Sequence, residues 1–113
     1  MPKKSEKILN RSQITPFCQA VYKATSLVPY GRVTTYAAIA RFLGKPRSAR
    51  AVGNALHINP FAPKVPCHRV VKSDGAVGGF ADGAKKKIAL LRREGVICLN
   101  GRVLDWSQKY YSF

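Results

Sequence analysis

Three prolines within seven residues limit what the middle of this chain of 113 residues can form. They are Pro60, Pro63 and Pro66. Each proline lacks the N–H that a helix needs, and each disfavours helical backbone at the residue before it. The stretch NPFAPKVPCHRVV, residues 59–71, is therefore predicted to be extended and to separate a helical part from a mixed part. Cys67 and His68 directly follow the last of these prolines.

Short helices joined by a tight turn are predicted before the prolines. Thr15 can cap a helix over residues 15–28 that has Pro16 in its first position. Thr35 can cap the helix YAAIARFL, which Gly44 would end. After the turn Gly44-Lys45-Pro46, the spacing of apolar residues predicts a further helix over 47–59. Two short helices with a glycine in the turn between them are typical of a helix-turn-helix.

The second helix of this pair is rich in small residues, which are Ala49, Ala51, Gly53 and Ala55. Small side chains let a helix approach another surface closely, and two interpretations remain open. The helix could enter a groove of duplex DNA, with Arg47 near its start and Arg50 reaching among the bases. Alternatively, the small residues only allow close helix packing, and Arg50 lies on a solvated edge.

The second half is predicted to contain a loop, a helix and a hairpin. Residues 73–83 are too rich in glycine for a core and suit a loop beside a ligand. A helix follows over 84–94, and its basic run Lys85–Lys87 is interpreted as a solvated face. Residues 96–106 read as a hairpin that turns at Asn100-Gly101, with Trp106 and Tyr110-Tyr111 packing late.

These elements predict a small, mainly α domain with a winged-helix-like helix-turn-helix core, a short β-hairpin and extended segments. The polar and basic residues 1–14 are predicted to be an N-terminal arm, and residues 15–113 a single domain.

The charge of the chain points to an anionic partner. Twenty Lys and Arg against five Asp and Glu give a net charge of +15. This charge favours nucleic acid, because neutralising phosphates releases counterions. An anionic membrane is the less favoured reading, because the basic runs are short. No apolar run reaches the roughly 20 residues of a membrane span, and the start MPKKSEK is unlike a signal peptide, so an intracellular protein is expected.

Three separate cysteines without a CxxC pair suggest neither a disulfide framework nor a zinc site. Cys18 lies beside the apolar face of the first predicted helix and Cys98 alternates with Ile97 and Leu99 in a predicted strand, so both are expected to belong to the core. Cys67 is different, because an imidazole and Arg69 follow it, and such neighbours can produce a thiolate nucleophile. Adjacent side chains on a strand point to opposite faces, however, and a buried structural cysteine fits the sequence as well.

Glu94 is one of five acidic residues and is expected in the last turn of its helix, where a negative charge opposes the helix dipole. This position predicts a specific partner for the carboxylate. His68 is one candidate, and an arginine of the same helix, Arg92 or Arg93, is the other.

Three ordered motifs together resemble the active domain of the O6-alkylguanine-DNA alkyltransferases. They are the string Ser48–Gly53, Asn59-Pro60 with Pro66–Val70, and Gly75–Gly78. The resemblance runs without gaps across the motifs from about Thr15 to Gly95. It implies repair of DNA by direct reversal of damage, in which an alkyl group on O6 of guanine moves to a cysteine in a single turnover that consumes the protein.

The resemblance also implies catalytic roles. Cys67 would accept the alkyl group, and His68 would remove its proton through a water. Glu94 would orient and polarise His68. Asn59 would hold the turn that joins the recognition helix to the cysteine. No metal or cofactor is expected, because guanine is a tolerable leaving group once its ring is protonated or hydrogen-bonded.

Binding roles follow in the same way. Arg50 would fill the space left by an extruded guanine, Tyr36 would lie against the phosphate at the lesion, and Leu56, taken to lie on the side of Arg50, could act as an apolar wedge. The further residues expected to contact DNA are Thr35, Arg47 and Ala51. The carbonyl of Val70 would accept from the guanine amino group. The rest of the expected pocket is Tyr36, Pro66, Gly78, Phe80 and Ala81.

The expected partner is double-stranded DNA carrying O6-alkylguanine, bound through its minor groove by a monomer that touches no membrane. The expected location is the cytoplasm at the nucleoid, or the nucleus in a eukaryote. Four positions in two segments depart from the family pattern: Phe80-Ala81-Asp82 stands where Tyr-Ser-Gly is usual, and Ala62 replaces a proline of the pocket wall. Ala81 lacks a hydroxyl that could contact the guanine oxygen, and the Asp82 carboxylate, expected at the pocket mouth, bears on whether bulky or anionic adducts are accepted.

Other functions remain to be weighed against this one. Short alkyltransferase-like proteins of similar length bind the same lesion and recruit excision repair, but they replace the cysteine, which this chain retains as Cys67. A transcription regulator would need base-reading side chains along the second helix, where only Asn54 is available. A cysteine hydrolase would use the same pair of residues but turn over repeatedly.

Overall fold

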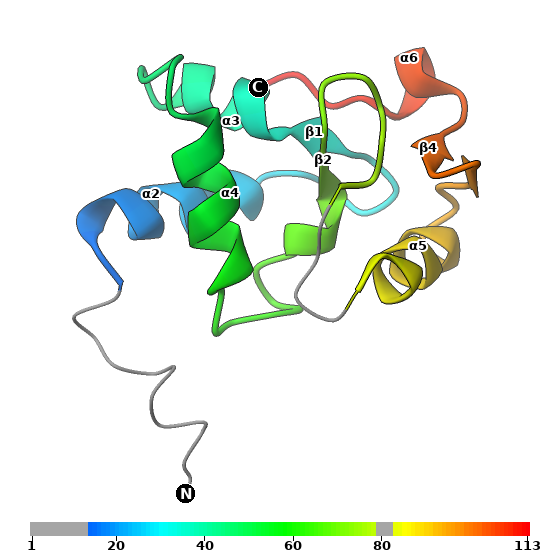
Figure 1. The fold of residues 1–113 in the computed structure, drawn as a ribbon, viewed down its shortest axis with the longest axis horizontal. Helices are drawn as coiled ribbons and strands as arrows, with labels where there is room; N and C mark the ends of the chain where they lie inside the picture. The colour runs from blue at the N-terminus through cyan, green and yellow to red at the C-terminus, as the bar shows by residue number, and fades with distance from the viewer. Residues whose placement is uncertain (1–13, 79–82) are drawn as a thin grey trace, which may run out of the picture.

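The structure, a computed structural model, describes residues 14–78 and 83–113. In this part of the chain the fold is mainly helical, with two small sheets (Figure 1). Helices α2, α3 and α4 pack against one another on one side of the molecule. Helix α5, strands β3 and β4 and helix α6 lie on the other side (Figure 1). This confirms the predicted mainly α class.

Helix α2 spans Pro16–Thr25 and begins as the sequence predicts. The Thr15 hydroxyl accepts from the backbone N–H of Cys18 at 3.1 Å, which satisfies one of the free donors of the first turn. The helix ends at Thr25, three residues before the predicted end. Val28 is nevertheless buried, because the chain continues to pack inward after the last turn.

The helix-turn-helix is confirmed as α3, Tyr36–Phe42, followed by α4, Ala49–His57. The Thr35 hydroxyl caps α3 by accepting from the N–H of Ala38 at 3.0 Å. Gly44 follows α3 with φ +76°, a left-handed conformation that favours glycine. The two helices make the most extensive contact between elements in the described chain.

The prediction of an extended segment over 59–71 is wrong for most of its length. Residues 60–65 form turns, and Cys67–Arg69 form one turn of 3-10 helix, η2. Only Val70–Val71 is a strand, β2, and it pairs in parallel with β1, Thr34–Thr35. Prolines exclude a long helix here, but they are compatible with tight turns, since their fixed φ suits turn positions.

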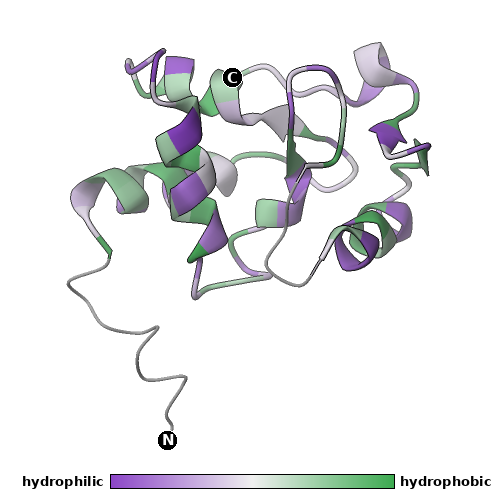
Figure 2. Cartoon of the chain, in the orientation of Figure 1, coloured by the Kyte–Doolittle hydropathy of each residue, from purple (hydrophilic) through white to green (hydrophobic). Residues whose placement is uncertain are grey.

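Strand β2 lies between two hydrophobic clusters. Side chains of consecutive strand residues point to opposite faces, so Val70 joins one cluster and Val71 the other. The first cluster is built mainly from α2, α3 and α4, and the second includes Val33, Leu91 and Val103. Figure 2 shows hydrophilic and hydrophobic residues on different sides of α4 and α5, as expected for helices that cover a core.

The last part of the chain contains α5, Ala84–Arg93, and the hairpin of β3, Cys98–Leu99, with β4, Arg102–Val103. The hairpin turns at Asn100 and Gly101, with φ of 53° and 77°, so this prediction is confirmed. Helix α6, Trp106–Lys109, was not predicted. In the described part of the chain no helix is both long and apolar enough to span a membrane.

Candidate active site

Cys67 lies at the start of η2 and is partly exposed. The backbone N–H of Cys67 donates to the carbonyl of Val65 at 2.8 Å, and that of Arg69 donates to the carbonyl of Pro66 at 2.9 Å. A 3-10 turn has three residues per turn, so neighbouring side chains diverge by about 120° rather than the 180° of a strand. The structure therefore supplies the turn that the Cys67-His68 sequence needs if the two side chains are to act on one substrate.

Asn59 forms two hydrogen bonds with the segment between α4 and η2. Its side-chain amide donates to the carbonyl of Val65 at 3.0 Å, and its side-chain oxygen accepts from the N–H of Phe61 at 2.9 Å. Both bonds fall on the loop that leads into Cys67. The contacts are those that the expected role of Asn59 requires, a brace between the recognition helix and the cysteine.

Glu94 is held by His68 and by Arg69. The Nε2 atom of His68 lies 2.8 Å from one carboxylate oxygen of Glu94. Arg69 donates to both oxygens, with Nε at 2.8 Å and Nη2 at 2.9 Å. The N–H of Gly31 donates to the same carboxylate at 3.3 Å. Of the two predicted partners His68 is the one observed, and the arginine that pairs with Glu94 is Arg69 rather than Arg92 or Arg93.

The carboxylate and the imidazole influence each other's pKa. Burial opposes ionisation of Glu94, but hydrogen bonds from Arg69 and His68 outweigh it and hold the pKa of Glu94 below its ordinary value. Burial lowers the pKa of His68, partly offset by the hydrogen bond to Glu94. A neutral His68 with its Nε2–H turned to a carboxylate has its lone pair on Nδ1, so it is arranged to act as a base.

Lys87 is the site residue that sequence reasoning missed. The interpretation of Lys85–Lys87 as a solvated face is wrong for this residue, which is 0% exposed. Its Nζ donates to the carbonyl of Val70 at 2.7 Å, lies 3.4 Å from the Tyr36 hydroxyl and sits 5.7 Å from the Tyr36 ring centre. Burial lowers the pKa of Lys87 to about 8. A signal was present, because Lys87 shares the helical spacing of Ile88 and Leu91.

Tyr36 interacts with both Lys87 and Cys67, through its hydroxyl with the former and electrostatically with the latter. Burial raises the pKa of Tyr36, and the negative charge of a Cys67 thiolate raises it further. A Cβ at Gly53 would lie 3.8 Å from the Tyr36 ring, so one of the small residues of α4 makes room for this ring. Ala55 is buried against α2, where its carbonyl accepts from Tyr22 at 2.7 Å. Gly53 and Ala55 therefore serve close packing, as the second interpretation predicts, and the entry of α4 into a groove of DNA stays a prediction.

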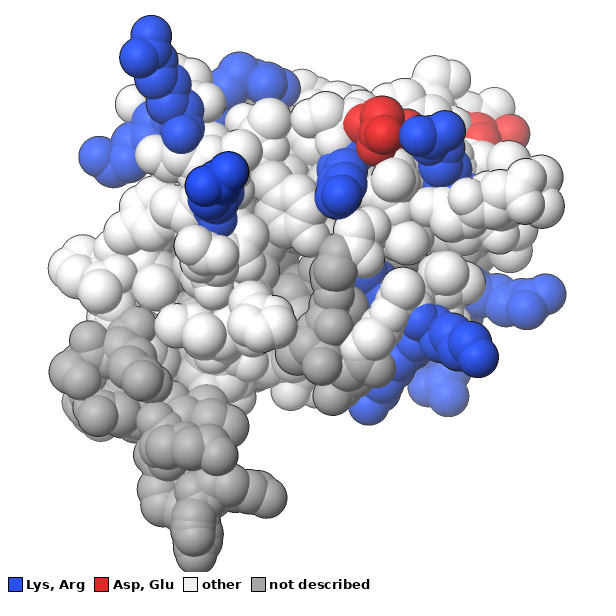
Figure 3. All heavy atoms as spheres, viewed as in Figure 1, with Lys and Arg blue, Asp and Glu red and all other residues white. Residues whose placement is uncertain are grey.

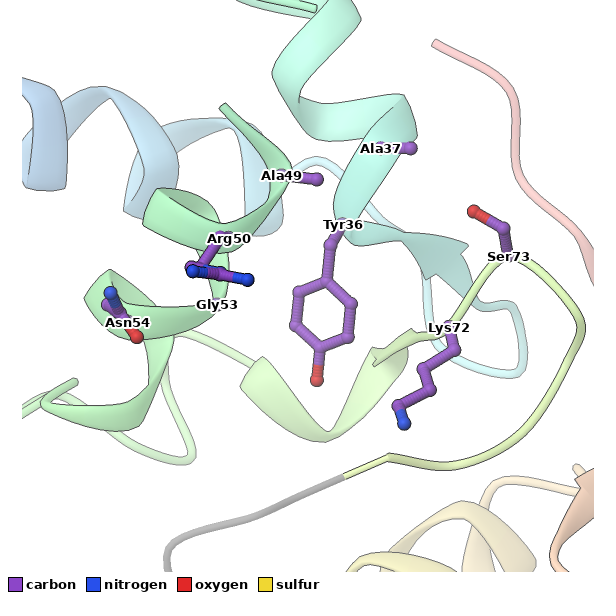
Figure 4. A pocket seen from close by; sticks show the side chains of 8 residues that line it. All are labelled: Tyr36, Ala37, Ala49, Arg50, Gly53, Asn54, Lys72 and Ser73. Carbon is purple, nitrogen blue, oxygen red and sulfur yellow. The ribbon is translucent and has the colours of Figure 1, made fainter. Parts of the chain in front are cut away.

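A cavity of about 420 Å³ lies between α3, α4 and the loop after β2. Its lining residues are Tyr36, Ala37, Ala49, Arg50, Gly53, Asn54, Lys72 and Ser73 (Figure 4). The Tyr36 hydroxyl and the Lys72 amine point to the same side of this space, toward η2 (Figure 4). Figure 3 shows several separate Lys and Arg side chains on this face of the molecule.

The other residues predicted to contact DNA differ in their exposure. Arg47, Arg50 and Ala51 are exposed near the start of α4. Thr35 is buried, and its hydroxyl is engaged as the cap of α3. The prediction that Leu56 lies on the side of Arg50 is wrong, because six residues of α-helix turn through about 240°, and Leu56 is 6% exposed within the first cluster.

The predicted pocket is described only in part. Pro66 and Val70 are buried, and Gly78, at φ +73°, packs against Lys72 and the Tyr36 hydroxyl. Phe80 and Ala81 lie outside the described residues. Cys18 is buried and Cys98 partly buried, in keeping with their predicted place in the core. Within residues 14–78 and 83–113, His, Cys, Asp and Glu side chains nowhere gather in groups of three that could hold a metal ion.

Comparison with known proteins places this site in a family. Residues 16–96 match the DNA-binding domain of 6-O-methylguanine DNA methyltransferase. The methylated-DNA–protein-cysteine methyltransferase of Salmonella typhimurium is 45% identical over 85 residues, which are 75% of this chain and 50% of that protein. The chain therefore belongs to the 6-O-methylguanine DNA methyltransferase family, and it spans about half the length of these curated relatives.

Two solved structures resemble the fold. One is Mycobacterium tuberculosis OGT in complex with DNA, with a TM-score of 0.69 and 46% identity over 71% of this chain and 50% of that one. The other is S. pombe Atl1 in complex with damaged DNA containing O6-carboxymethylguanine, with a TM-score of 0.75 and 34% identity. That match covers 86% of this chain and 95% of Atl1.

Proposed function

We propose that this protein repairs DNA by moving the alkyl group of O6-alkylguanine to Cys67, once per molecule. The observation that carries the proposal is the pair formed by His68 and Glu94 directly beside Cys67, joined at 2.8 Å and buried. A structural cysteine needs no oriented base next to it. A nucleophilic cysteine does, because the thiolate rather than the thiol attacks.

The proposed reaction is a single displacement. His68 takes the proton of the Cys67 thiol through a water, using the Nδ1 lone pair that the contact of Nε2 with Glu94 leaves free. The sulfur then bonds to the alkyl carbon while the bond from that carbon to O6 breaks, and the electron pair stays on guanine. The guanine ring takes up a proton as it leaves, and the Tyr36 hydroxyl is the proposed donor; Tyr36 then regains a proton from solvent, and His68 releases the thiol proton to solvent. The products are guanine and an S-alkylcysteine, which does not hydrolyse readily.

Lys87 is proposed to position the other side of the site. Its Nζ bonds the Val70 carbonyl at 2.7 Å, and a carbonyl oxygen has two lone pairs, so one remains for the amino group of guanine. The same amine lies 3.4 Å from the Tyr36 hydroxyl. One buried cation therefore touches both groups that would contact the base. A negative charge at Cys67 would raise the pKa of Lys87, so the amine lies within electrostatic reach of the nucleophile.

Binding is proposed to occur at the minor groove of duplex DNA, with α4 as the element that approaches it. The small residues at the start of α4 permit a close approach, and Arg50 is exposed there to fill the space of an extruded guanine. Phosphate contacts by a chain of net charge +15 supply binding that is independent of sequence. We propose that the protein acts as a monomer and is located with the DNA, at the nucleoid or in a nucleus.

A second candidate is lesion binding without transfer. The match to S. pombe Atl1 favours it, because that match covers 95% of Atl1 and 86% of this chain. Cys67 beside the His68–Glu94 pair favours transfer instead. The two functions differ in whether a covalent product forms.

The deciding experiment uses duplex DNA with a radiolabelled methyl group on O6 of guanine. Wild-type protein is expected to take up one label per molecule, and the Cys67→Ala variant none, while both bind the duplex with similar affinity because the thiol makes no phosphate contact. Cys98→Ala, which removes another partly buried thiol, is the matched control and should label fully. Tight lesion binding without label in the wild type would establish the second candidate, and repeated turnover would indicate a hydrolase.

A further inference from the structure

Lys72 stands at the edge of the cavity, immediately after β2. Its backbone is fixed by a tight turn, in which its N–H donates to the carbonyl of Ala76 at 2.9 Å and its carbonyl accepts from the N–H of Gly75 at 2.9 Å. Gly75 has φ +84°, and a Cβ there would lie 3.5 Å from Trp106. The turn that carries Lys72 therefore depends on glycine, and its backbone position is well defined.

The side chain of Lys72 packs against Gly78, beside Tyr36. A Cβ at Gly78 would lie 3.4 Å from Cγ and 3.6 Å from Cε of Lys72, and 3.5 Å from the hydroxyl of Tyr36. The aliphatic part of Lys72 thus runs over Gly78, beside Tyr36. Its amine points to the same side as the Tyr36 hydroxyl (Figure 4). A lysine that packs its stem in this way keeps its charge in a limited region while remaining hydrated.

The residues that line the cavity give it a positive character. Among the described residues, those that line it include Arg50 and Lys72 but no Asp or Glu, and Asp82 lies outside the described residues. The nearest acidic residue along the chain, Asp74, is turned away, because one of its oxygens pairs with Arg102 at 3.1 Å and the other accepts from the N–H of Ala76 at 3.0 Å. Among the described residues, Asp74 therefore does not neutralise Lys72 from within the same turn.

We propose that Lys72 forms an anion subsite that favours O6-adducts ending in a carboxylate, such as O6-carboxymethylguanine, over uncharged adducts of the same size. This inference rests on the proposed function, since it needs the flipped guanine to enter between Tyr36 and the turn of Lys72. The Tyr36 hydroxyl lies 3.4 Å from Lys87 Nζ, which bonds the Val70 carbonyl at 2.7 Å, so the groups beside Lys72 adjoin the segment that carries Cys67. A carboxylate extending from O6 would then find an ammonium on the Tyr36 side of the cavity.

The test compares two lesions in one duplex sequence: O6-carboxymethylguanine and its neutral amide isostere, O6-carbamoylmethylguanine. Single-turnover transfer rates are measured for wild type, Lys72→Met and Lys72→Arg. Methionine keeps an aliphatic stem over Gly78 without the charge. We expect the ratio of the acid rate to the amide rate to fall about three- to fivefold in Lys72→Met, the size of an exposed ion pair. Lys72→Arg should retain the wild-type ratio.

Lys23→Met is the matched control, because it removes an exposed lysine from α2, away from the cavity lining. Equal losses on both lesions in Lys72→Met would show that Lys72 binds a backbone phosphate, and no loss on either would show that it binds neither group; both results overturn the proposal. If wild type transfers neither adduct, nor methyl, the proposed function fails. The ratio of the two dissociation constants then tests Lys72 separately, with the same three- to fivefold change expected.

Discussion

Helix α5 carries Lys87 near its N-terminal end and is followed by Glu94 at its C-terminal end. The surroundings favour the charged form of Glu94 and disfavour the charged form of Lys87. At the C-terminal end, hydrogen bonds from Arg69 and His68 outweigh burial and favour the charged form of Glu94. Near the N-terminal end, burial dominates at Lys87 and lowers its pKa to about 8. Its hydrogen bonds to the Val70 carbonyl and the Tyr36 hydroxyl are to uncharged oxygens.

The difference separates two tasks. A carboxylate that stays ionised over the whole neutral range is a fixed support, and it holds the His68 ring in one orientation. A cation whose pKa lies near neutrality costs stability to bury, and such groups are concentrated at functional sites. The comparison therefore predicts that the Glu94 end contributes to both folding and chemistry, and the Lys87 end mainly to chemistry.

The largest effect is expected from Glu94→Gln. The change leaves the Arg69 charge without its partner in a mostly buried site, and should lower the free energy of unfolding by about 3 kcal/mol. The transfer rate should fall by about 100-fold, because His68 loses the carboxylate that orients it. Urea unfolding and single-turnover labelling measure the two effects. Asp105→Asn, which removes an exposed carboxylate, is the control and should change neither.

Lys87→Met tests the other end. At pH 7 we expect transfer to fall about tenfold, with the free energy of unfolding lowered by no more than about 1 kcal/mol, because relief from burying a charge offsets the lost hydrogen bond to Val70. The stability difference should also depend on pH. Between about 8 and 10.5 the unfolded chain retains a proton on Lys87 that the folded chain has lost, so raising the pH favours the folded state.

Over this range the free energy of unfolding of the wild type should rise by up to about 3 kcal/mol relative to that of Lys87→Met. The pKa of Lys87 differs between 10.5 in the unfolded chain and about 8 in the folded one, and a pKa difference of one corresponds to about 1.36 kcal/mol. Chemical unfolding at several pH values measures the gain. Lys85→Met removes an exposed lysine from the same helix and is the matched control. If Lys87→Met lowered the free energy of unfolding at pH 7 as much as Glu94→Gln does, the proposed division of tasks between the two ends of α5 would be wrong.

The smallest effect is a shift in the acid limb of the pH–rate profile. Burial lowers the pKa of His68, so the wild-type rate should fall off with a midpoint below 6.5 as His68 takes up a proton. The hydrogen bond that His68 donates to Glu94 raises that pKa, so Glu94→Gln should move the midpoint to lower pH. Stopped-flow transfer rates between pH 4.5 and 8 give both midpoints. Movement to higher pH would show that Glu94 does not act on His68.

Local chemistry accounts for what the sequence could predict. Thr15 and Thr35 are caps whose hydroxyls bond within the next turn, and Asn100-Gly101 sets its hairpin by backbone preference alone. The pairing of Glu94 with His68 was also within reach, because an acid at the end of a helix in such a basic chain needs a partner.

The remaining features depend on contacts between distant segments. Strands of two residues, such as β1 and β2, carry no periodicity that a sequence pattern could reveal. The spacing of Lys87 from Ile88 and Leu91 indicates the apolar side of its helix, but its contacts with Val70 and Tyr36 arise only from the packing of α5. Prolines at 60, 63 and 66 exclude a long helix but do not distinguish a strand from the 3-10 turn that carries Cys67.

The contact of residues 109–111 with Arg32 and Val33 has a consequence for the order of folding. The N–H of Val33 donates to the carbonyl of Lys109 at 2.8 Å, that of Tyr111 donates to the carbonyl of Val33 at 2.6 Å, and Arg32 donates to the carbonyl of Tyr110 at 2.7 Å. These bonds close a loop of nearly the whole domain, so their entropic cost is incurred late, after α2, α3 and α4 have gathered. During synthesis the strand that leads into the helix-turn-helix keeps an open edge until residues 109–111 have left the ribosome.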